Sequence, residues 1–251
     1  MTAANGRKSI FITGGASGIG LAAAKRFAKE GWFVGLSDID AGGLKLAQGV
    51  LGAGNCSTHK LDVRDRKAWD KALAEFAKAS GGRLDVLLNN AGIRCRKAFG
   101  SYTRADFATV VSVNLAAAFF ASQAVLPAMR AQGGGRIIHV ASQMGSVAAE
   151  ENALYGLTKA ALIHLTRNMA FELAKEGIQV NSVSPGPIAT QFNLDTWGRM
   201  PGKLETMVGR VPAGRMGEAR EVAEAIVFLA TAEGSYIQGH DLVVDGGYII
   251  H

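Results

Sequence analysis

Short apolar runs alternate with longer amphipathic segments along the 251-residue chain, and this alternation constrains the fold more than any other feature. The runs Val86–Leu88 and Ile137–Val140 are entirely aliphatic or nearly so, as expected of strands buried on both faces. Between such runs, apolar residues recur at helical spacing, as in Leu21–Lys29. The chain is therefore expected to form an α/β fold, in which a mostly parallel, doubly wound sheet carries helices on both faces.

Strands and helices can be assigned from these patterns, and no internal repeat or low-complexity linker divides the chain. The expected strands are residues 10–13, 32–37, 58–61, 84–89, 136–141, 179–184 and 241–244, and the expected helices are residues 21–29, 41–51, 67–79, 104–130, 152–175 and 221–230. We therefore expect one Rossmann-like domain over residues 1–251, built on a seven-stranded sheet. Residues 187–212 lack clear periodicity and contain several Pro and Gly residues, so this segment is expected to be a lid over a binding crevice.

The net charge of +6 invites comparison with nucleic-acid-binding proteins. Lys and Arg residues are nevertheless scattered singly or in pairs, and the densest cluster consists of only Arg94, Arg96 and Lys97. Such a cluster is too small to form a stripe that follows a phosphate backbone. We therefore expect no nucleic-acid partner.

Cysteine content and hydropathy indicate the compartment. Cys56 and Cys95 are too few for a disulfide framework and lack metal-ligand spacing. The first eight residues are polar, unlike a signal peptide, and the longest apolar stretch, Leu115–Met129, is interrupted by polar residues and a proline. These features predict a cytoplasmic protein that does not cross a membrane.

A glycine-rich turn lies where the first expected strand meets the first expected helix. Glycines allow positive φ and close approach of the backbone, so amides at the start of the helix can bind a pyrophosphate. The candidate cofactor-binding residues in this turn are Gly14, Ser17, Gly18, Ile19 and Gly20. Their spacing is Gly-x-x-x-Gly-x-Gly, and a purely structural turn remains the alternative.

An acidic residue, Asp38, follows the second expected strand, 18 residues after Gly20. A carboxylate at this position can accept hydrogen bonds from the adenosine ribose hydroxyls and would repel a 2′-phosphate. The sequence therefore predicts NAD rather than NADP as the cofactor. The alternative reading, a helix N-cap, suits Asp40 better than Asp38 because Asp40 directly precedes the expected helix.

Tyr155 and Lys159 are four residues apart on an expected helix, so their side chains share one face. A nearby ammonium should lower the pKa of the phenol, which is about 10 when unperturbed, and prepare it for proton transfer. Ser142 follows the strand expected at 136–141, at the edge where open α/β sheets bind ligands. The alternative for the Tyr–Lys pair is an exposed contact between neighbouring turns of the helix.

These residues together resemble the motifs of the short-chain dehydrogenase/reductase family, and the resemblance covers essentially the whole chain. The matching residues are Thr13–Gly20, Asp62, Val63, Asn89, Asn90, Ala91, Gly92, Asn114, Ser142, Tyr155, Lys159, Pro185, Gly186 and Thr190.

The resemblance implies a separate role in the reaction for each of four residues. Tyr155 would exchange a proton with the substrate oxygen, and Ser142 would orient that oxygen. Lys159 would bind the nicotinamide ribose and lower the pKa of Tyr155. Asn114 would hold a water that relays protons from Lys159 to solvent, a role that helical spacing alone does not suggest. No metal is expected in such a site.

The resemblance also implies the remaining cofactor contacts. Asp62 and Val63 would border the adenine, and Ile188 and Thr190 would hold the nicotinamide carboxamide. The segments Asn90, Ala91, Gly92 and Pro185, Gly186 would shape the crevice. Because family members commonly assemble through two long helices and the last strand, a homotetramer is expected.

The sequence constrains the identity of the substrate less than that of the cofactor. Arg94, Gln143 and Asn152 are expected near the ligand edge of the sheet, and they favour a small polar substrate such as a hydroxy acid, a polyol or a sugar derivative. The alternative is that Arg94 and its basic neighbours are solvated loop charges. Two other functions stay open: reduction of a 3-oxoacyl thioester on an acyl carrier protein, and a catalytically silent NAD-binding sensor.

Overall fold

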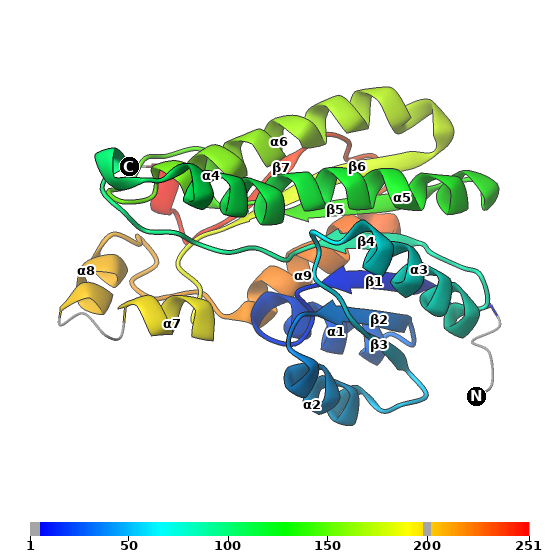
Figure 1. Cartoon of the computed structure of the whole chain (residues 1–251). Helices are drawn as coiled ribbons and strands as arrows, with labels where there is room; N and C mark the ends of the chain where they lie inside the picture. The colour runs from blue at the N-terminus through cyan, green and yellow to red at the C-terminus, as the bar shows by residue number, and fades with distance from the viewer. Residues whose placement is uncertain (1–5, 198–201, 251) are drawn as a thin grey trace.

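All seven expected strands and all six expected helices are present, with ends shifted by a few residues (Figure 1). The computed structural model describes residues 6–197 and 202–250. The strands are β1 (Ser9–Thr13), β2 (Phe33–Asp38), β3 (Cys56–Lys60), β4 (Val86–Asn89), β5 (Gly135–Val140), β6 (Ile178–Pro185) and β7 (Asp241–Val244). The helices are α1 (Gly18–Lys29), α2 (Ala41–Leu51), α3 (Arg66–Ser80), α4 (Arg104–Val111), α5 (Ala117–Ala131), α6 (Ala153–Leu173), α7 (Gln191–Trp197), α8 (Lys203–Gly209) and α9 (Ala219–Ala230).

The strands form one parallel sheet in the order β3-β2-β1-β4-β5-β6-β7. The chain starts in the middle of the sheet, proceeds to one edge through β3 and then crosses to the other side of β1 through β4. This reversal between β1 and β4 is a topological switch point, and ligands of open α/β sheets bind outside the carboxyl ends of the strands there. The Rossmann-like doubly wound sheet predicted from the sequence is confirmed.

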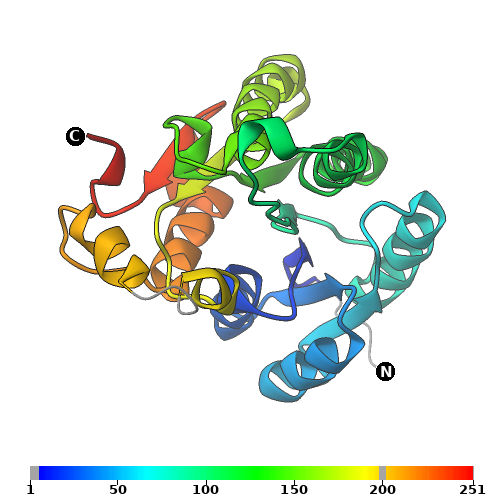
Figure 2. The same ribbon diagram turned by 60° about the vertical axis from the view of Figure 1, so that its left-hand side comes forward.

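Alternating residues of β1 point into two separate cores, one on each face of the sheet. Ile10 and Ile12 pack with α1, α2 and α9, whereas Phe11 packs with α3, α5 and α6. Figures 1 and 2 show these two sets of helices on opposite faces of the sheet. Because both faces are covered, the strands can be aliphatic throughout, which explains the apolar runs in the sequence.

The long helix expected at residues 104–130 has one irregular segment. Between α4 and α5, residues Ser112–Ala116 form a π-helical turn. A π-turn inserts an extra residue into the helix and is common at functional sites. Here it places Asn114, which is 1% exposed, toward the sheet instead of toward solvent.

The same helix, Arg104–Ala131, is long and apolar enough to span a membrane by length and composition: it has 28 residues, and an 18-residue window within it has a mean hydropathy of 1.6. Its residues Ala121, Val125 and Met129 nevertheless pack into the core that covers β4 and β5. A helix that covers a parallel sheet needs such a composition, so this feature is weak evidence for a membrane span.

The segment that lacked periodicity contains two short helices, α7 and α8 (Figure 2). Its base is closed by a bridge between Ile188 and Gly217, in which Ala189 N–H donates to Gly217 O at 2.8 Å and Gly217 N–H donates to Pro187 O at 2.9 Å. The lid expected at residues 187–212 includes residues 198–201, which lie outside the described residues.

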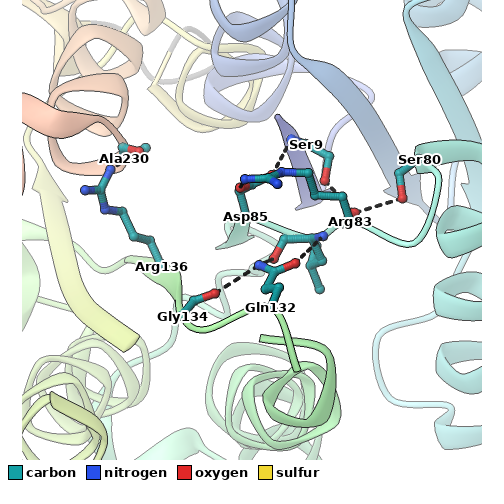
Figure 3. A network of polar contacts seen from close by, with 9 residues as sticks. Ser9, Ser80, Arg83, Asp85, Gln132, Gly134, Arg136 and Ala230 are labelled. Carbon is teal, nitrogen blue, oxygen red and sulfur yellow. Dashed lines mark hydrogen bonds and ion pairs between the residues drawn. The ribbon is translucent and has the colours of Figure 1, made fainter. Parts of the chain in front are cut away.

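The amino ends of the central strands are held by a polar network (Figure 3). Asp85 pairs with Arg83 at 2.6 Å and accepts from Ser9 N–H at 2.8 Å, while Gln132 Nε2 donates to the carbonyl oxygens of Leu84 and Gly134. Arg136 donates to the carbonyl oxygen of Ala230, at the end of α9. A hollow of about 830 Å³ adjoins this network. The polar side chains of the network bind backbone groups of loops and helix ends, so we assign this edge of the sheet a structural role.

Candidate active site

The carboxyl ends of β1, β2, β4, β5 and β6 surround a cleft of about 510 Å³. It runs between the start of α1 and the start of α6, at the switch point of the sheet. Eighteen of the predicted site residues line it: Gly14, Ser17, Gly18, Ile19, Asp38, Asp62, Val63, Asn90, Ala91, Gly92, Arg94, Ser142, Tyr155, Lys159, Pro185, Gly186, Ile188 and Thr190. Gly20, Asn114, Gln143 and Asn152 lie around this cleft without lining it.

The glycine-rich turn brings the backbone at the start of α1 to the cleft. Gly14 and Gly18 have φ of 65° and 54°, in the left-handed region that favours glycine. A Cβ on Gly20 would lie 2.2 Å from the carbonyl oxygen of Gly14, so this position excludes any side chain. Asn90 Nδ2 fixes the turn by donating to the carbonyl oxygens of Thr13 and Gly14, both at 2.9 Å. The result is a helix amino terminus open to an anionic ligand.

Asp38 lies at the end of β2, on the rim of the cleft. Its two carboxylate oxygens accept from Ala16 N–H and Asp40 N–H, each at 3.1 Å. Asp40, in turn, caps α2 by accepting from Gly43 N–H at 3.0 Å. The prediction that Asp40 rather than Asp38 is the helix cap is therefore confirmed. Asp38 keeps free acceptor capacity, because each carboxylate oxygen has more than one lone-pair site.

One basic residue at this end of the cleft was missed by the sequence reasoning. Arg64 lines the cleft and pairs with Asp62, with 2.6 Å between Nη2 and Oδ2. Arg64 lies two residues after Asp62, and this spacing matches no motif that would mark Arg64 as a site residue.

Tyr155 and Lys159 are both buried, with exposed fractions of 7% and 3%. The alternative of an exposed contact is therefore wrong. Lys159 Nζ lies 5.6 Å from the centre of the Tyr155 ring and donates to Val140 O at 2.7 Å. Burial raises the pKa of Tyr155. The charges of Lys159 and Arg94, together with hydrogen bonds from Ser142 and Arg94, lower the pKa by more than burial raises it, so the pKa lies below its usual value.

The ammonium of Lys159 is itself perturbed. Burial lowers its pKa, Tyr155 opposes that change, and the charge of Arg94 adds to it. Ser142 is buried at the start of the turn after β5, where its Oγ accepts from Met144 N–H at 3.2 Å. Tyr155 and Lys159 on α6 and Ser142 in the turn after β5 thus lie at one end of the cleft.

Asn114 lies behind this group, in the π-turn. Its Oδ1 accepts from Ile93 N–H at 2.8 Å, and its Nδ2 donates to Ile93 O at 2.9 Å and to Thr158 Oγ1 at 3.2 Å. A Cβ on Gly92 would lie 3.5 Å from Asn114 Oδ1 and 3.6 Å from Lys159 Nζ, so both polar atoms adjoin the same small space. The amide fixes the chain after β4 beside Lys159.

Arg94 enters the cleft between two aromatic rings. Its guanidinium carbon lies 4.9 Å from the centre of the Tyr155 ring and 4.8 Å from that of Phe192, and Nη1 donates to Asn193 Oδ1 at 3.2 Å. Arg94 is therefore not a solvated loop charge. Its neighbour Lys97 is partly exposed and pairs with Asp106 at 2.6 Å, outside the cleft. Sequence periodicity gave no sign of Phe192 or Asn193, because α7 is too short to show one.

A second cavity of about 390 Å³ adjoins the cleft. Arg94, Ser142 and Gly186 line both spaces, and Gln143 and Asn152 line the second one. Gln143 is 3% exposed, whereas the Asn152 amide donates to Glu150 O at 2.7 Å. Two of the three residues expected to contact substrate, Gln143 and Asn152, thus lie on the far side of Ser142 from the glycine-rich turn.

Comparisons with known proteins identify relatives of this chain. A family model described as enoyl-(acyl carrier protein) reductase matches residues 14–249. The chain is 38% identical over 248 residues to the 3-oxoacyl-[acyl-carrier-protein] reductase FabG of Thermotoga maritima, covering 97% of this chain and 98% of that protein. It is also 38% identical over 251 residues to the L-rhamnose 1-dehydrogenase (NAD(P)(+)) of Azotobacter vinelandii, covering 97% of both.

Two solved structures are similar along their whole length. The 3-ketoacyl-(acyl-carrier-protein) reductase from Brucella melitensis, complexed with NADH, superposes with a TM-score of 0.90 at 29% identity, covering 96% of this chain and 98% of that chain. ElxO with NADP bound superposes with a TM-score of 0.89 at 32% identity, covering 98% of this chain and 100% of that chain. The fold, the cleft and these relatives together show that the chain belongs to the short-chain dehydrogenase/reductase family of oxidoreductases.

Proposed function

We propose that the protein is an NAD-dependent oxidoreductase that moves a hydride between the nicotinamide and a secondary alcohol or ketone, with a small polar molecule as substrate. The observation that carries this proposal is the burial of Tyr155, Lys159 and Ser142 together at one end of a cleft whose other end holds Asp38. The residues proposed to react and the residue proposed to accept from a ribose hydroxyl thus line the same cleft.

The cleft fits a dinucleotide. The collision that any side chain on Gly20 would make with Gly14 leaves the start of α1 bare, as a pyrophosphate requires. Asp38 would accept from the adenosine ribose, Asp62 and Val63 would border the adenine, and Ile188 and Thr190 would hold the carboxamide. When bound, the cofactor would supply or accept the hydride.

The chain's own residues would handle the proton. During oxidation, Tyr155 as phenolate would take the hydroxyl proton of the alcohol, and during reduction the phenol would return a proton to the carbonyl oxygen. Ser142 would donate a hydrogen bond to that oxygen. Lys159 would hold the nicotinamide ribose and favour the phenolate, while Asn114 would fix Ile93 beside Lys159 and orient a water for proton exchange.

The preference for NAD over NADP is tested by steady-state kinetics with both cofactors. Asp38 would repel a 2′-phosphate, and Arg64 is already paired with Asp62. We expect kcat/KM for NAD to exceed that for NADP by at least about 10-fold with a panel of secondary alcohols. Equal values would contradict the role of Asp38.

A second candidate is the reduction of a 3-oxoacyl thioester on an acyl carrier protein, because the Thermotoga maritima and Brucella melitensis relatives carry that description. The rhamnose dehydrogenase relative favours the small polar substrate instead. Assays with acetoacetyl-CoA and NADPH, beside sugars and hydroxy acids with NAD, distinguish the two.

We also expect a cytoplasmic homotetramer. Phe119 and Phe120 on α5 and Leu157 on α6 are at least 39% exposed, and such apolar side chains suit an interface between copies of the chain. Light scattering of the purified protein gives the oligomeric state.

A further inference from the structure

We propose that the second cavity is an anion subsite, in which Arg94 and Arg96 bind a carboxylate of the substrate next to the carbon that reacts. This inference rests on the proposed function, because it places a chemical group on the substrate of that same site. It selects a hydroxy acid, or the corresponding oxo acid, from the polar substrates considered above.

The cavity lies where such a group would have to be. Arg94, Ser142 and Gly186 line both the cleft and the second cavity, so the two spaces meet beside Ser142. A substrate whose oxygen contacts Ser142 and Tyr155 would direct one of its substituents into the second cavity. A Cβ on Gly186 would lie 2.6 Å from Asp245 Cα and 2.8 Å from Gln143 Oε1, so this shared wall has room only for glycine.

Three buried polar atoms around the cavity have no partner within residues 6–197 and 202–250. They are the Nε atoms of Arg94 and Arg96 and the Oε1 atom of Gln143. Burying a donor or acceptor without a hydrogen bond costs about 1–3 kcal/mol, and more for a charged group. A carboxylate would accept from N–H groups of the two guanidinium ions, and a hydroxyl or water beside it would donate to Gln143.

Among the charged groups around the cavity, one half-buried cation has no carboxylate partner in the described part of the chain. Arg96 pairs with Glu151 at 3.0 Å, and Glu150 and Arg210 are both exposed at the rim. Arg94 contacts two aromatic rings, a neutral amide and the Tyr155 hydroxyl, but no carboxylate in the described part of the chain. One unpaired guanidinium matches a monoanion, so a carboxylate fits better than a phosphate dianion.

Both guanidinium groups are held in place before any ligand arrives. The rings of Tyr155 and Phe192 fix Arg94. Arg96 is held by Glu151, whose backbone has φ of 57° and whose carbonyl oxygen accepts from Tyr102 Oη at 3.2 Å. A fixed pair of donors loses little conformational entropy on binding, which favours tight recognition of a planar anion.

The test compares hydroxy acids with their neutral analogues. The substrates are 2-, 3- and 4-hydroxy carboxylates of four to six carbons, each beside its methyl ester and amide, and the proteins are the wild type, Arg94→Gln and Arg96→Gln. Lys97→Gln is the matched control, because it removes one positive charge from the same loop but outside both cavities. Since Arg94 also contacts Tyr155, the readout is the ratio of kcat/KM for acid and ester, in which a common effect on proton transfer cancels.

We expect the wild type and Lys97→Gln to favour at least one acid over its ester, and Arg94→Gln to reduce that ratio by on the order of 10- to 100-fold. Arg96→Gln should reduce it less, because its charge is shared with Glu151. Equal turnover of acids and esters, with a ratio that Arg94→Gln leaves unchanged, would overturn the anion subsite while the oxidoreductase proposal stands.

Absence of turnover with every alcohol and ketone would instead refute the proposed function, and calorimetry then decides the subsite. Binding of butanoate but not butanamide, lost in Arg94→Gln and kept in Lys97→Gln, would support it. Failure of the wild type to bind butanoate would overturn it.

Discussion

Replacing Gly20 by alanine tests whether the glycine-rich turn is shaped for a cofactor. The new Cβ would lie 2.2 Å from the carbonyl oxygen of Gly14 and 2.8 Å from Asn90 Nδ2. Since van der Waals contact needs about 3.5 Å, the turn and the start of α1 must separate by roughly 1 Å. That displacement would also disturb the hydrogen bonds from Asn90 to Thr13 and Gly14.

Overpacking of this kind costs about 1–3 kcal/mol of folding stability. The displaced amides would also weaken pyrophosphate binding, and we expect Kd for NAD to rise at least about 10-fold, or about 1.4 kcal/mol. Urea unfolding and calorimetric titration with NAD measure the two effects. The matched control is Gly49→Ala, on the exposed side of α2 with no atom within 4 Å of the new Cβ, which should be neutral or slightly stabilising. Unchanged NAD affinity in Gly20→Ala would refute the assignment of the turn.

Two further predictions concern buried titrating groups. Lys159→Met removes an ammonium that lowers the pKa of Tyr155. Because oxidation needs the phenolate, the pH of half-maximal alcohol oxidation should move upward in a pH–rate profile. An unchanged profile would exclude this coupling between Lys159 and Tyr155. Burial and then the charge of Lys159 lower the pKa of His139 to about 3. Below its unfolded pKa of about 6.5, the unfolded chain binds more protons, so this group should remove about 3 kcal/mol of stability between pH 7 and pH 4. His139→Met should flatten that slope in urea titrations, and parallel slopes would contradict it.

Most of the fold could be predicted because its signals are local. Most strands are short apolar runs and the covering helices have repeating apolar faces, so their order alone implies a parallel, doubly wound sheet. The π-turn at Ser112–Ala116 could not be predicted, because its apolar pattern is that of an ordinary helix. The helices α7 and α8 have seven residues each, too few to show a repeat.

The candidate site also contains residues that the sequence could predict and residues that it could not. Glycines of the turn, Asp38, Tyr155 and Lys159 follow from local spacing, because each is read against a neighbouring strand or helix. Contacts such as Arg94 with Phe192 join residues far apart in the chain, and no local pattern encodes them. The burial of Asn114 depends on a partner 21 residues away, Ile93. Long-range contacts of this kind decide which polar residue is part of a site and which is solvated.

The most direct test of the account is the activity of Tyr155→Phe measured beside its affinity for NADH. Loss of the phenolic oxygen alone should lower turnover of the secondary alcohol and ketone panel by roughly 100- to 10,000-fold, with the calorimetric Kd for NADH within about threefold of the wild type. Substantial turnover by this variant would show that the proton moves through another group and would contradict the central claim.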